Sequence, residues 1–275
     1  MGHCIVPEAE AVLDKEIKVL DKGFVRLVDY LGSDERIVQS ARVSYGEGTK
    51  SYRQDRGLVR YLLRNDHTSP FEQVILTFHI KTPLFIARQW LRHRTARVNE
   101  ISGRYSVMKN EFFVPDPAFL AKQSDDNKQG RENEPMDGAS AAKILEQMQS
   151  TQETIYKGYQ ELLDTGLARE LARINLPLSM YTEFYWQIDL HNLFHFLRLR
   201  MDSHAQKEIR DYADVLYSLT EKVCPMACEA FHDYKLGAVL LSSGEADAVK
   251  AMLAGKENTL SGRDLELFNE KFNLD

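Results

Sequence analysis

An alternation of apolar and polar residues over positions 73–82 is the feature that most limits what this chain can fold into. Large apolar residues occupy every second position from Val74 to Ile80, and these alternate with Ile75, Thr77, His79 and Lys81. A period of two places successive side chains on opposite faces of a strand, so one face should be core. Residues 180–187 repeat this pattern, and residues 18–31 are also strand-like.

Elsewhere the apolar residues recur at helical spacing. One expected helix begins at Pro83, after Thr82 as its cap, because proline at the first helical position loses no needed donor. The expected helices span residues 34–43, 55–65, 83–94, 141–163, 168–175, 189–201 and 203–223. The chain should therefore form an α+β fold in which a small, mainly antiparallel sheet packs with several helices.

The expected organisation is one domain over residues 18–240, preceded by an extension over residues 1–17. Within the domain, residues 122–140 are rich in Lys, Asp, Asn, Gln, Gly and Glu, which predicts a surface loop or a disordered insertion. Residues 241–275 are polar with weak periodicity, and we expect a peripheral tail.

The charge balance and the apolar runs limit the partners. A net charge of −6 and a pI near 5.8 indicate no general affinity for nucleic acid. The charged N-terminal region is not typical of a secretory signal, and no apolar run approaches the roughly 18 residues of a membrane span. We therefore expect a cytoplasmic protein with no nucleic-acid or membrane partner.

The cysteines are Cys4, Cys224 and Cys228, too few for a disulfide framework in 275 residues. Cys224 and Cys228 could face one another across a helical turn, either as zinc ligands or as packing residues. Without a second ligand pair at zinc spacing, packing is favoured and no metal is expected.

Five arginines fall within one short segment of this acidic chain: Arg88, Arg92, Arg94, Arg97 and Arg104. Arginine offers a fixed fork of donors suited to phosphate or to a carbonyl-rich ring. Ser102-Gly103-Arg104 adds a hydroxyl, close backbone approach and a cation, which together could hold a phosphate. A solvated basic face with salt-bridge partners explains the spacing equally well.

The segment Arg92-His93-Arg94, followed by seven residues and Ser102, resembles the signature of the flavin-dependent thymidylate synthases. Further similar segments are Ala41-Arg42-Val43-Ser44, His67-Thr68-Ser69-Pro70-Phe71-Glu72, Ala87-Arg88-Gln89-Trp90, Asn99-Glu100-Ile101-Ser102-Gly103-Arg104-Tyr105, Ala172-Arg173-Ile174-Asn175-Leu176-Pro177 and Leu199-Arg200-Met201-Asp202-Ser203-His204-Ala205-Gln206. The resemblance covers residues 18–235. Arg97 stands where the family often has serine, and neither residues 122–140 nor the tail after 240 has a counterpart that the motifs identify.

The resemblance implies reductive methylation of dUMP to dTMP. Methylenetetrahydrofolate would supply the carbon, and NADPH would reduce FAD, the hydride donor. None of the cysteines lies in the matched motifs, in agreement with a route that needs no enzyme thiolate. The chain has no Gly-x-Gly-x-x-Gly fingerprint after a strand, so the flavin site should not be of the Rossmann type. The family also implies a homotetramer whose sites are shared between subunits.

The resemblance further implies two ligand sets. The nucleotide set is Gln89, Arg92, Glu100, Ile101, Ser102, Gly103, Arg104, Arg173 and Arg200. Within it, Ser102, Arg104 and Arg173 would hold phosphate and sugar, and Arg200 would polarise the uracil; Gln89 and Arg92 would share a helical face. The FAD set is Ser44, His67, Ser69, Glu72, Arg92, His93, Arg94, Glu100, Asp189, His191 and His195.

Several alternatives stand beside these roles. Ser102 could be a nucleophile, although no triad-like order of Ser, His and acid is apparent, and a contact role is favoured. His191 and His195 have metal-ligand spacing but no evident third ligand. Trp90, Phe78, Trp186 and Phe194 could stack on a ligand, but core packing is the better interpretation. An arginine-rich binding module for RNA or phosphoproteins and a metal-dependent phosphohydrolase remain rival functions.

Overall fold

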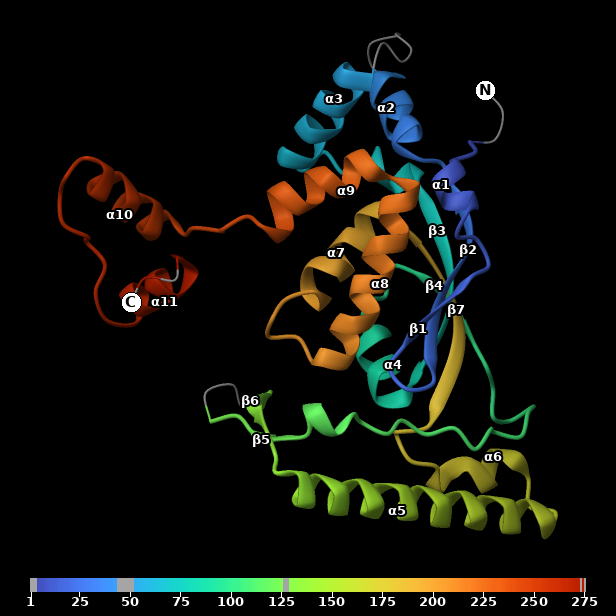
Figure 1. Ribbon diagram of the computed structural model, residues 1–275. Helices are drawn as coiled ribbons and strands as arrows, with labels where there is room; N and C mark the ends of the chain where they lie inside the picture. Colours follow the sequence, from blue (N-terminus) through green and yellow to red (C-terminus); the bar gives the residue numbers. More distant parts are fainter. Residues whose placement is uncertain (1–3, 44–51, 126–128, 273, 275) are drawn as a thin grey trace. The chain divides into compact units, whose positions relative to one another are not determined.

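The computed structural model describes residues 4–43, 52–125, 129–272 and 274 (Figure 1). It divides into two compact units, Met1–Phe231 and His232–Asp275. No helix in the described ranges is long and apolar enough to cross a membrane.

A five-stranded sheet of order β1-β2-β3-β7-β4 forms the centre of the first unit, and every pair in it is antiparallel. Its strands are β1 (Glu16–Val19), β2 (Gly23–Leu31), β3 (Ile75–Pro83), β7 (Tyr181–Asp189) and β4 (Arg97–Glu100). The α+β prediction and the strands expected over 73–82 and 180–187 are confirmed.

The strand-like segment 18–31 is a hairpin, because the chain turns between β1 and β2. Leu20 has a φ of 59° in this turn. Gly23 then lies so close to Tyr212 that an added Cβ would stand 2.0 Å from its hydroxyl. That hydroxyl donates a 2.7 Å hydrogen bond to the carbonyl of Lys81. Because glycine has no side chain, the helix that carries Tyr212 can pack closely against the hairpin.

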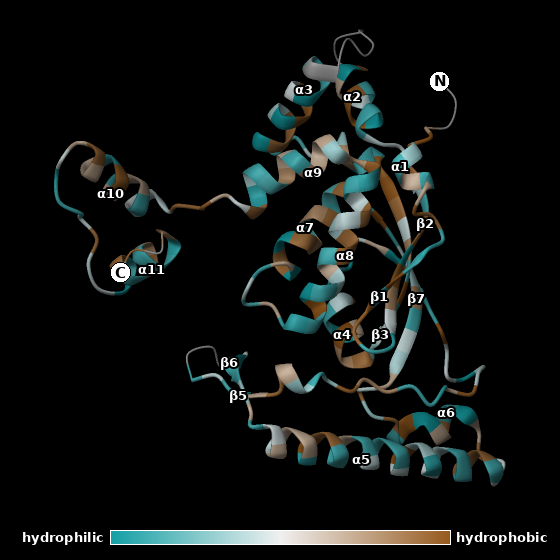
Figure 2. Ribbon diagram, in the orientation of Figure 1, coloured by the Kyte–Doolittle hydropathy of each residue, from teal (hydrophilic) through white to brown (hydrophobic). Residues whose placement is uncertain are grey.

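Helices α4 (Leu84–Trp90), α7 (Leu190–Arg200) and α8 (Lys207–Val223) cover one face of the sheet (Figure 1). Between them Trp90 packs against Trp186 and Phe196, with ring centroids 5.3 and 4.9 Å apart. Hydrophobic residues concentrate in the sheet and in these helices (Figure 2). Phe78 and Phe194 are buried too, which confirms that all four aromatic residues are core.

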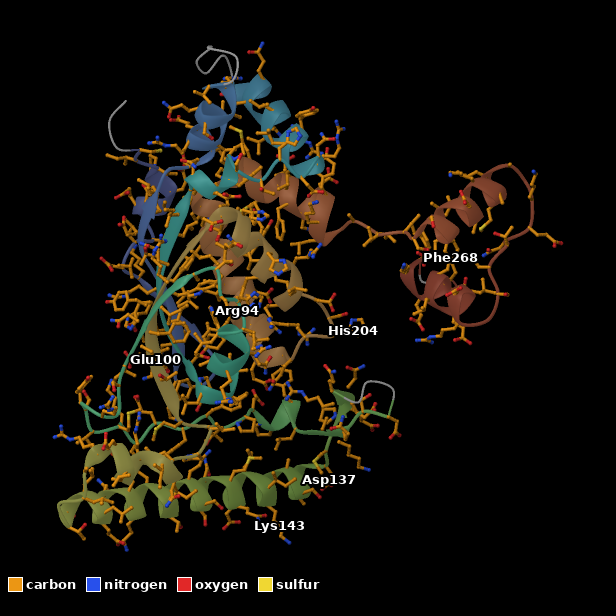
Figure 3. The ribbon with its side chains drawn as sticks, turned by 180° about the vertical axis from the view of Figure 1, so that it is seen from behind. Arg94, Glu100, Asp137, Lys143, His204 and Phe268 are labelled. Carbon is orange, nitrogen blue, oxygen red and sulfur yellow. The ribbon has the colours of Figure 1, made fainter. Side chains whose placement is uncertain are left out.

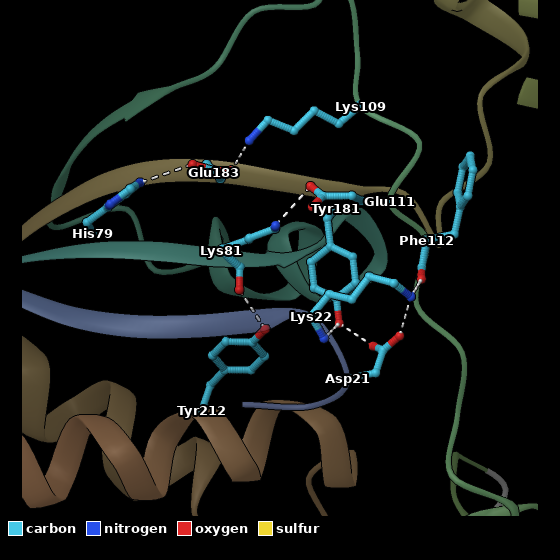
Figure 4. Close-up of polar contacts among 10 residues, drawn as sticks. All are labelled: Asp21, Lys22, His79, Lys81, Lys109, Glu111, Phe112, Tyr181, Glu183 and Tyr212. Carbon is cyan, nitrogen blue, oxygen red and sulfur yellow. Dashed lines mark hydrogen bonds and ion pairs between the residues drawn. The ribbon is translucent and has the colours of Figure 1, made fainter. Parts of the chain in front are cut away.

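The opposite face of the sheet is polar, as strand alternation requires. His79 stacks on Tyr185, with centroids 4.7 Å apart, and its Nε2 lies 3.4 Å from Glu183 (Figure 4). The Tyr181 hydroxyl donates a 2.6 Å hydrogen bond to Asp21 and thereby joins the β1–β2 turn to β7.

Helix α4 is shorter than the expected helix 83–94. It begins at Leu84, with Pro83 as its N-cap, and Thr82 belongs to β3 instead of capping it. The amides of Leu84 and Phe85 donate to the carbonyls of Met180 and Leu178, so neighbouring backbone replaces the side-chain cap. The helix ends at Trp90, and residues 91–96 lead into β4.

Near the start of the chain, α1 (Pro7–Glu10) precedes the sheet, and α2 (Asp34–Arg42) and α3 (Tyr52–Arg64) follow β2. Ser33 caps α2, because its hydroxyl accepts from the amide of Glu35. Helix α9 (Pro225–Phe231) packs against α3.

The long helix expected after the polar stretch is α5 (Gly138–Asp164), and α6 (Arg169–Ala172) follows it. Where a loop or disordered insertion was expected, the chain forms a small hairpin of β5 (Ala121–Gln123) and β6 (Arg131–Pro135). Its backbone hydrogen bonds need no apolar side chains, which is why the composition did not predict it.

The second unit contains α10 (Ser243–Leu253) and α11 (Gly262–Phe272), so the expected tail is largely helical. Phe268 (labelled in Figure 3) is buried within this unit, and Lys271 lies 2.7 Å from Glu245. Ser242 and Glu245 form a capping box at the start of α10.

Candidate functional site

Residues 91–104 run from the end of α4 to the edge strand β4 and the turn beyond it. Arg94 and Glu100 lie at separate points along this segment (Figure 3). Polar residues from distant parts of the chain meet each end of it, and the two ends form different environments.

The α4 end meets the end of α7. Nε of Arg200 donates a 3.1 Å hydrogen bond to Nε2 of His93, and Nη2 donates to the carbonyl of Gln89 at 3.4 Å. The side-chain amide of Gln89 donates at 2.5 Å to Gln206, which precedes α8. Three elements thus converge on one polar cluster.

Charge in this cluster is concentrated on Arg200. Burial, then the charge of Arg200 and then His195, lower the pKa of His93 to about 4, so the imidazole is neutral at physiological pH. Because Nε2 accepts from Arg200, the ring proton sits on Nδ1. Burial also lowers the pKa of Arg200, whose described hydrogen bonds go to this neutral ring and to a carbonyl. No carboxylate in that set cancels its charge.

The other end meets α6 and the short helix η4 (Arg173–Asn175). A Cβ on Gly103 would stand 3.0 Å from Cδ of Arg173, so glycine permits the close approach of this arginine. The Arg104 amide donates to Oγ of Ser102 at 3.3 Å, and Nε of Arg104 lies 3.5 Å from Glu170 in an exposed pair. The turn therefore carries the Ser102 hydroxyl and the Arg104 guanidinium, and the side chain of Arg173 packs against its glycine.

Edge strand β4 carries Glu100 and leads to Ile101. Glu100 accepts a 2.6 Å hydrogen bond from the hydroxyl of Thr182, and the amide of Ile101 donates to the carbonyl of Glu183 at 2.9 Å. Both contacts fix the start of the turn against β7.

The structure thus brings Gln89 together with Arg200 and Gly103 together with Arg173. It does not place Gln89 and Arg92 on one helical face, because the helix ends at Trp90 and Arg92 lies in the turn that follows. That expectation is wrong. Arg92 is exposed, and its place is set by the turn instead of by helical spacing.

Most of the residues expected around FAD lie near α7. The loop carrying His67 and Ser69 leads into a short helix, η2 (Phe71–Gln73), which contains Glu72 and packs on α7. There Phe71 contacts Phe194, with ring centroids 6.4 Å apart. His191 and His195 are on α7 itself, whereas Ser44 lies outside the described residues.

These residues fit an extended anionic cofactor. Arg92, Arg94, His67 and Ser69 are exposed on loops, where cations and donors can reach a diphosphate. Asp189 is already engaged as the N-cap of α7, because it accepts from the amide and the side chain of Asn192.

The alternative chemistries have little support in this geometry. The described hydrogen bond of the Ser102 hydroxyl is to a backbone amide, not to a histidine. Among the described residues, no three His, Cys, Asp or Glu side chains gather as a metal site. Cys224 and Cys228 are fully buried, and burial raises the pKa of both thiols, which disfavours the thiolate that a nucleophile requires.

Sequence reasoning assigned no role to Gln206 or Thr182, the partners of Gln89 and Glu100. Gln206 is the last residue of the matched motif that begins at Leu199, and this position could have indicated a role in the site. Thr182 lies on the helix-facing side of an expected strand, and only the register of β4 against β7 brings it to Glu100.

Two family descriptions match the chain. One, "Thymidylate synthase complementing protein", covers residues 26–226, and the other, "Thymidylate synthase ThyX C-terminal domain", covers residues 239–273. The second match corrects the expectation that the tail after residue 240 has no family counterpart.

Proteins of similar sequence align with nearly the whole length of this chain. A flavin-dependent thymidylate synthase of Treponema denticola is 62% identical over 259 residues, covering 94% of this chain and 97% of the relative. One from Treponema pallidum is 52% identical over 271 residues, covering 98% and 89%. The crystal structure of a UMP/dUMP methylase, PolB from Streptomyces cacaoi, bound with 5-Br dUMP, has a TM-score of 0.73 at 34% identity, covering 80% of this chain and 99% of that one.

Proposed function

The chain belongs to the thymidylate synthase complementing protein family, the flavin-dependent thymidylate synthases, and we propose that it methylates dUMP to dTMP. Methylenetetrahydrofolate supplies the one-carbon unit and NADPH the reducing equivalents. FAD, held by the residues named below, would supply the hydride that completes the methyl group. The observation that carries this proposal is the pairing of Arg200 with a neutral His93 beside Gln89.

Arg200 is suited to polarising the uracil ring. A ring attacked without an enzyme thiolate must be made electron-rich, and a cation near its carbonyl oxygens and N3 stabilises the negative charge that develops there. Because His93 is neutral, the hydrogen bond positions the guanidinium without cancelling its charge. Gln89 lies beside it as a further uracil contact.

The Ser102-Gly103-Arg104 turn is suited to the phosphate and sugar of dUMP. Arg104 and Arg173 offer the forked donors that phosphate oxygens accept, Ser102 adds a hydroxyl, and Gly103 leaves room for Arg173. Glu100, Ile101 and Arg92 are the remaining nucleotide contacts. Ser102 acts as a contact in this assignment and not as a nucleophile.

FAD would be held by the loops next to α7. The proposed contacts are Ser44, His67, Ser69, Glu72, Arg92, His93, Arg94, Glu100, Asp189, His191 and His195. Arg92 and Arg94 supply positive charge for the diphosphate. The antiparallel sheet provides no Rossmann crevice, so the dinucleotide would bind to these loops.

The active protein is proposed to be a cytoplasmic homotetramer whose sites are shared between subunits. The exposure of Arg92, Arg94 and Ile101 on one protomer supports this, because a site assembled from such residues needs a second surface to exclude water.

An anaerobic assay for thymidylate tests the proposal. Purified protein with FAD, dUMP, NADPH and methylenetetrahydrofolate should produce dTMP, and leaving out any one component should abolish the product. Absence of dTMP with every component present, from protein that binds FAD, would refute the reaction. Light scattering should show a tetramer, and a monomer with full activity would contradict shared sites.

A further inference from the structure

A cavity of about 570 Å³ lies between the β5–β6 hairpin and the residues that lead into α8. Ala121, Gln123 and residues 129–133 of the hairpin line one wall, and residues 203–207 together with Arg210 line the other. Gln206 belongs to this wall and also bonds to Gln89 of the proposed nucleotide site. The cavity therefore adjoins the cluster of Gln89 and Arg200, the arginine proposed to polarise the uracil.

The lining is rich in cations. Arg131, Lys207 and Arg210 contribute to it, together with His204 (labelled in Figure 3), whereas Glu132 is the one carboxylate among the described lining residues. Glu132 already accepts a 3.0 Å hydrogen bond from the amide of Asp125. Among the lining residues themselves cations therefore outnumber carboxylates, and the positive charge left for a ligand depends on the pairs that these cations make with Glu208, Asp211 and Asp202.

The three cations differ in how far the protein already satisfies them. Arg131 lies 3.0 Å from Glu208, and Lys207 lies 2.6 Å from Asp211 and 4.2 Å from the ring centroid of Phe119. Arg210 differs, because its Nε is buried without a hydrogen-bond partner in the described structure. A buried guanidinium donor left unpaired is costly, and a bound anion next to the group would offset that cost.

Resting on the proposed function, we infer that this cavity binds the anionic end of a co-substrate whose reactive ring lies at the Gln89 and Arg200 cluster. Both co-substrates have suitable chemistry. Methylenetetrahydrofolate carries glutamate carboxylates, and NADPH carries phosphates, in each case far from the reacting ring. The side-chain amide of Asn133 adds a donor for such oxygens.

Binding to the FAD-loaded, dUMP-bound enzyme tests this inference. Arg210→Gln and Lys207→Gln remove lining cations, and Lys122→Gln is the matched control, since Lys122 is on the same hairpin but does not line the cavity. Titration would use tetrahydrofolate with one or three glutamates, and NADP⁺ with NAD⁺ for comparison. Thermal unfolding would verify that each variant folds.

Arg210→Gln should weaken one ligand about tenfold, the effect of losing a charge-assisted hydrogen bond. Lys207→Gln should weaken the same ligand less, because Asp211 already holds that lysine. A loss larger for triglutamate than for monoglutamate would assign the cavity to folate, and a loss for NADP⁺ but not for NAD⁺ would assign it to the 2′-phosphate.

Unchanged affinity for all four ligands in both folded variants, or an equal loss in Lys122→Gln, would overturn the inference. Because the titrations do not require turnover, these outcomes are distinct from failure of the proposed reaction, which would appear as absence of dTMP in the unsubstituted enzyme.

Discussion

Arg200 donates a hydrogen bond from Nε to Nε2 of His93, 3.1 Å away, and the two residues are 107 positions apart in the chain. This bond joins α7 to the turn after α4. It also makes the ionisation of His93 depend on Arg200, because a nearby cation disfavours a second positive charge.

Replacing Arg200 with glutamine should raise the pKa of His93 from about 4 toward its ordinary 6.5, stopping short because burial is the larger cause. Side-chain NMR of labelled histidine measures this directly. The folded-state pKa of His93 lies below the unfolded one, so its contribution to stability is present above pH 6.5 and is lost as the pH falls through about 4. Arg198→Gln, on the same helix, should leave this pKa in place; an equal shift there would contradict a specific pairing.

Arg104→Ala should weaken dUMP binding about tenfold or more while FAD stays bound, because the proposed partner of Arg104 is the phosphate. Stability should change little, since the pair with Glu170 is exposed. Isothermal titration with dUMP and the flavin absorbance of the purified protein measure the two effects. Lys143→Ala, which removes a surface cation from α5, is the control. Equal loss of both ligands would argue against separate sites.

Gly103→Ala should weaken dUMP binding severalfold, because the new Cβ would lie 3.0 Å from both Arg173 and Met108 and displace them. Overpacking of this kind costs about 1 kcal/mol or more. Gly158→Ala is a matched control, since no atom beyond the adjoining backbone of its own helix lies within 4 Å of its added Cβ. If dUMP affinity were the same in both variants, the close approach of Arg173 would not matter for binding.

Ser102→Ala should lower kcat/KM for dUMP by about tenfold, the cost of one hydrogen bond to a substrate group. A nucleophile would behave differently, because its removal eliminates the chemical step while binding remains. Steady-state kinetics combined with dUMP titration separates these outcomes. Complete loss of activity with unchanged dUMP affinity would reopen the nucleophile hypothesis.

Asp34→Asn should alter how stability depends on pH. Burial raises the pKa of Asp34 to about 6, although its carboxylate accepts from the amides of Met226 and Ala227 at 2.7 and 3.0 Å. A raised pKa favours the fold below about pH 4, and this contribution, on the order of 3 kcal/mol, is lost as the pH rises through about 6. Urea unfolding between these values should show stability falling with pH relative to the variant. If the free energy of unfolding depended on pH in the same way in the unsubstituted protein and in Asp34→Asn, the raised pKa of Asp34 would be refuted.

Local patterns in the sequence were sufficient for much of the fold. The alternation that includes Phe78 and Trp186 predicts two central strands, because strand geometry forces every second side chain to one face. Ser33 marks the start of α2 for a reason equally local, namely that its hydroxyl satisfies a free amide within the next turn. The resemblance carried by the motifs also predicts Arg200 and Arg173 as site residues.

Only the tertiary structure decided how those residues meet. Residues near Trp90 have helical spacing up to position 94, yet the helix ends at Trp90, so Gln89 and Arg92 do not share the expected helical face, and Gln89 contacts Arg200. The contact of Arg173 with Gly103, like that of Arg200 with His93, depends on where separate elements pack. Periodicity records which face of an element is buried, but the partner across that face is set by packing between elements distant in the chain.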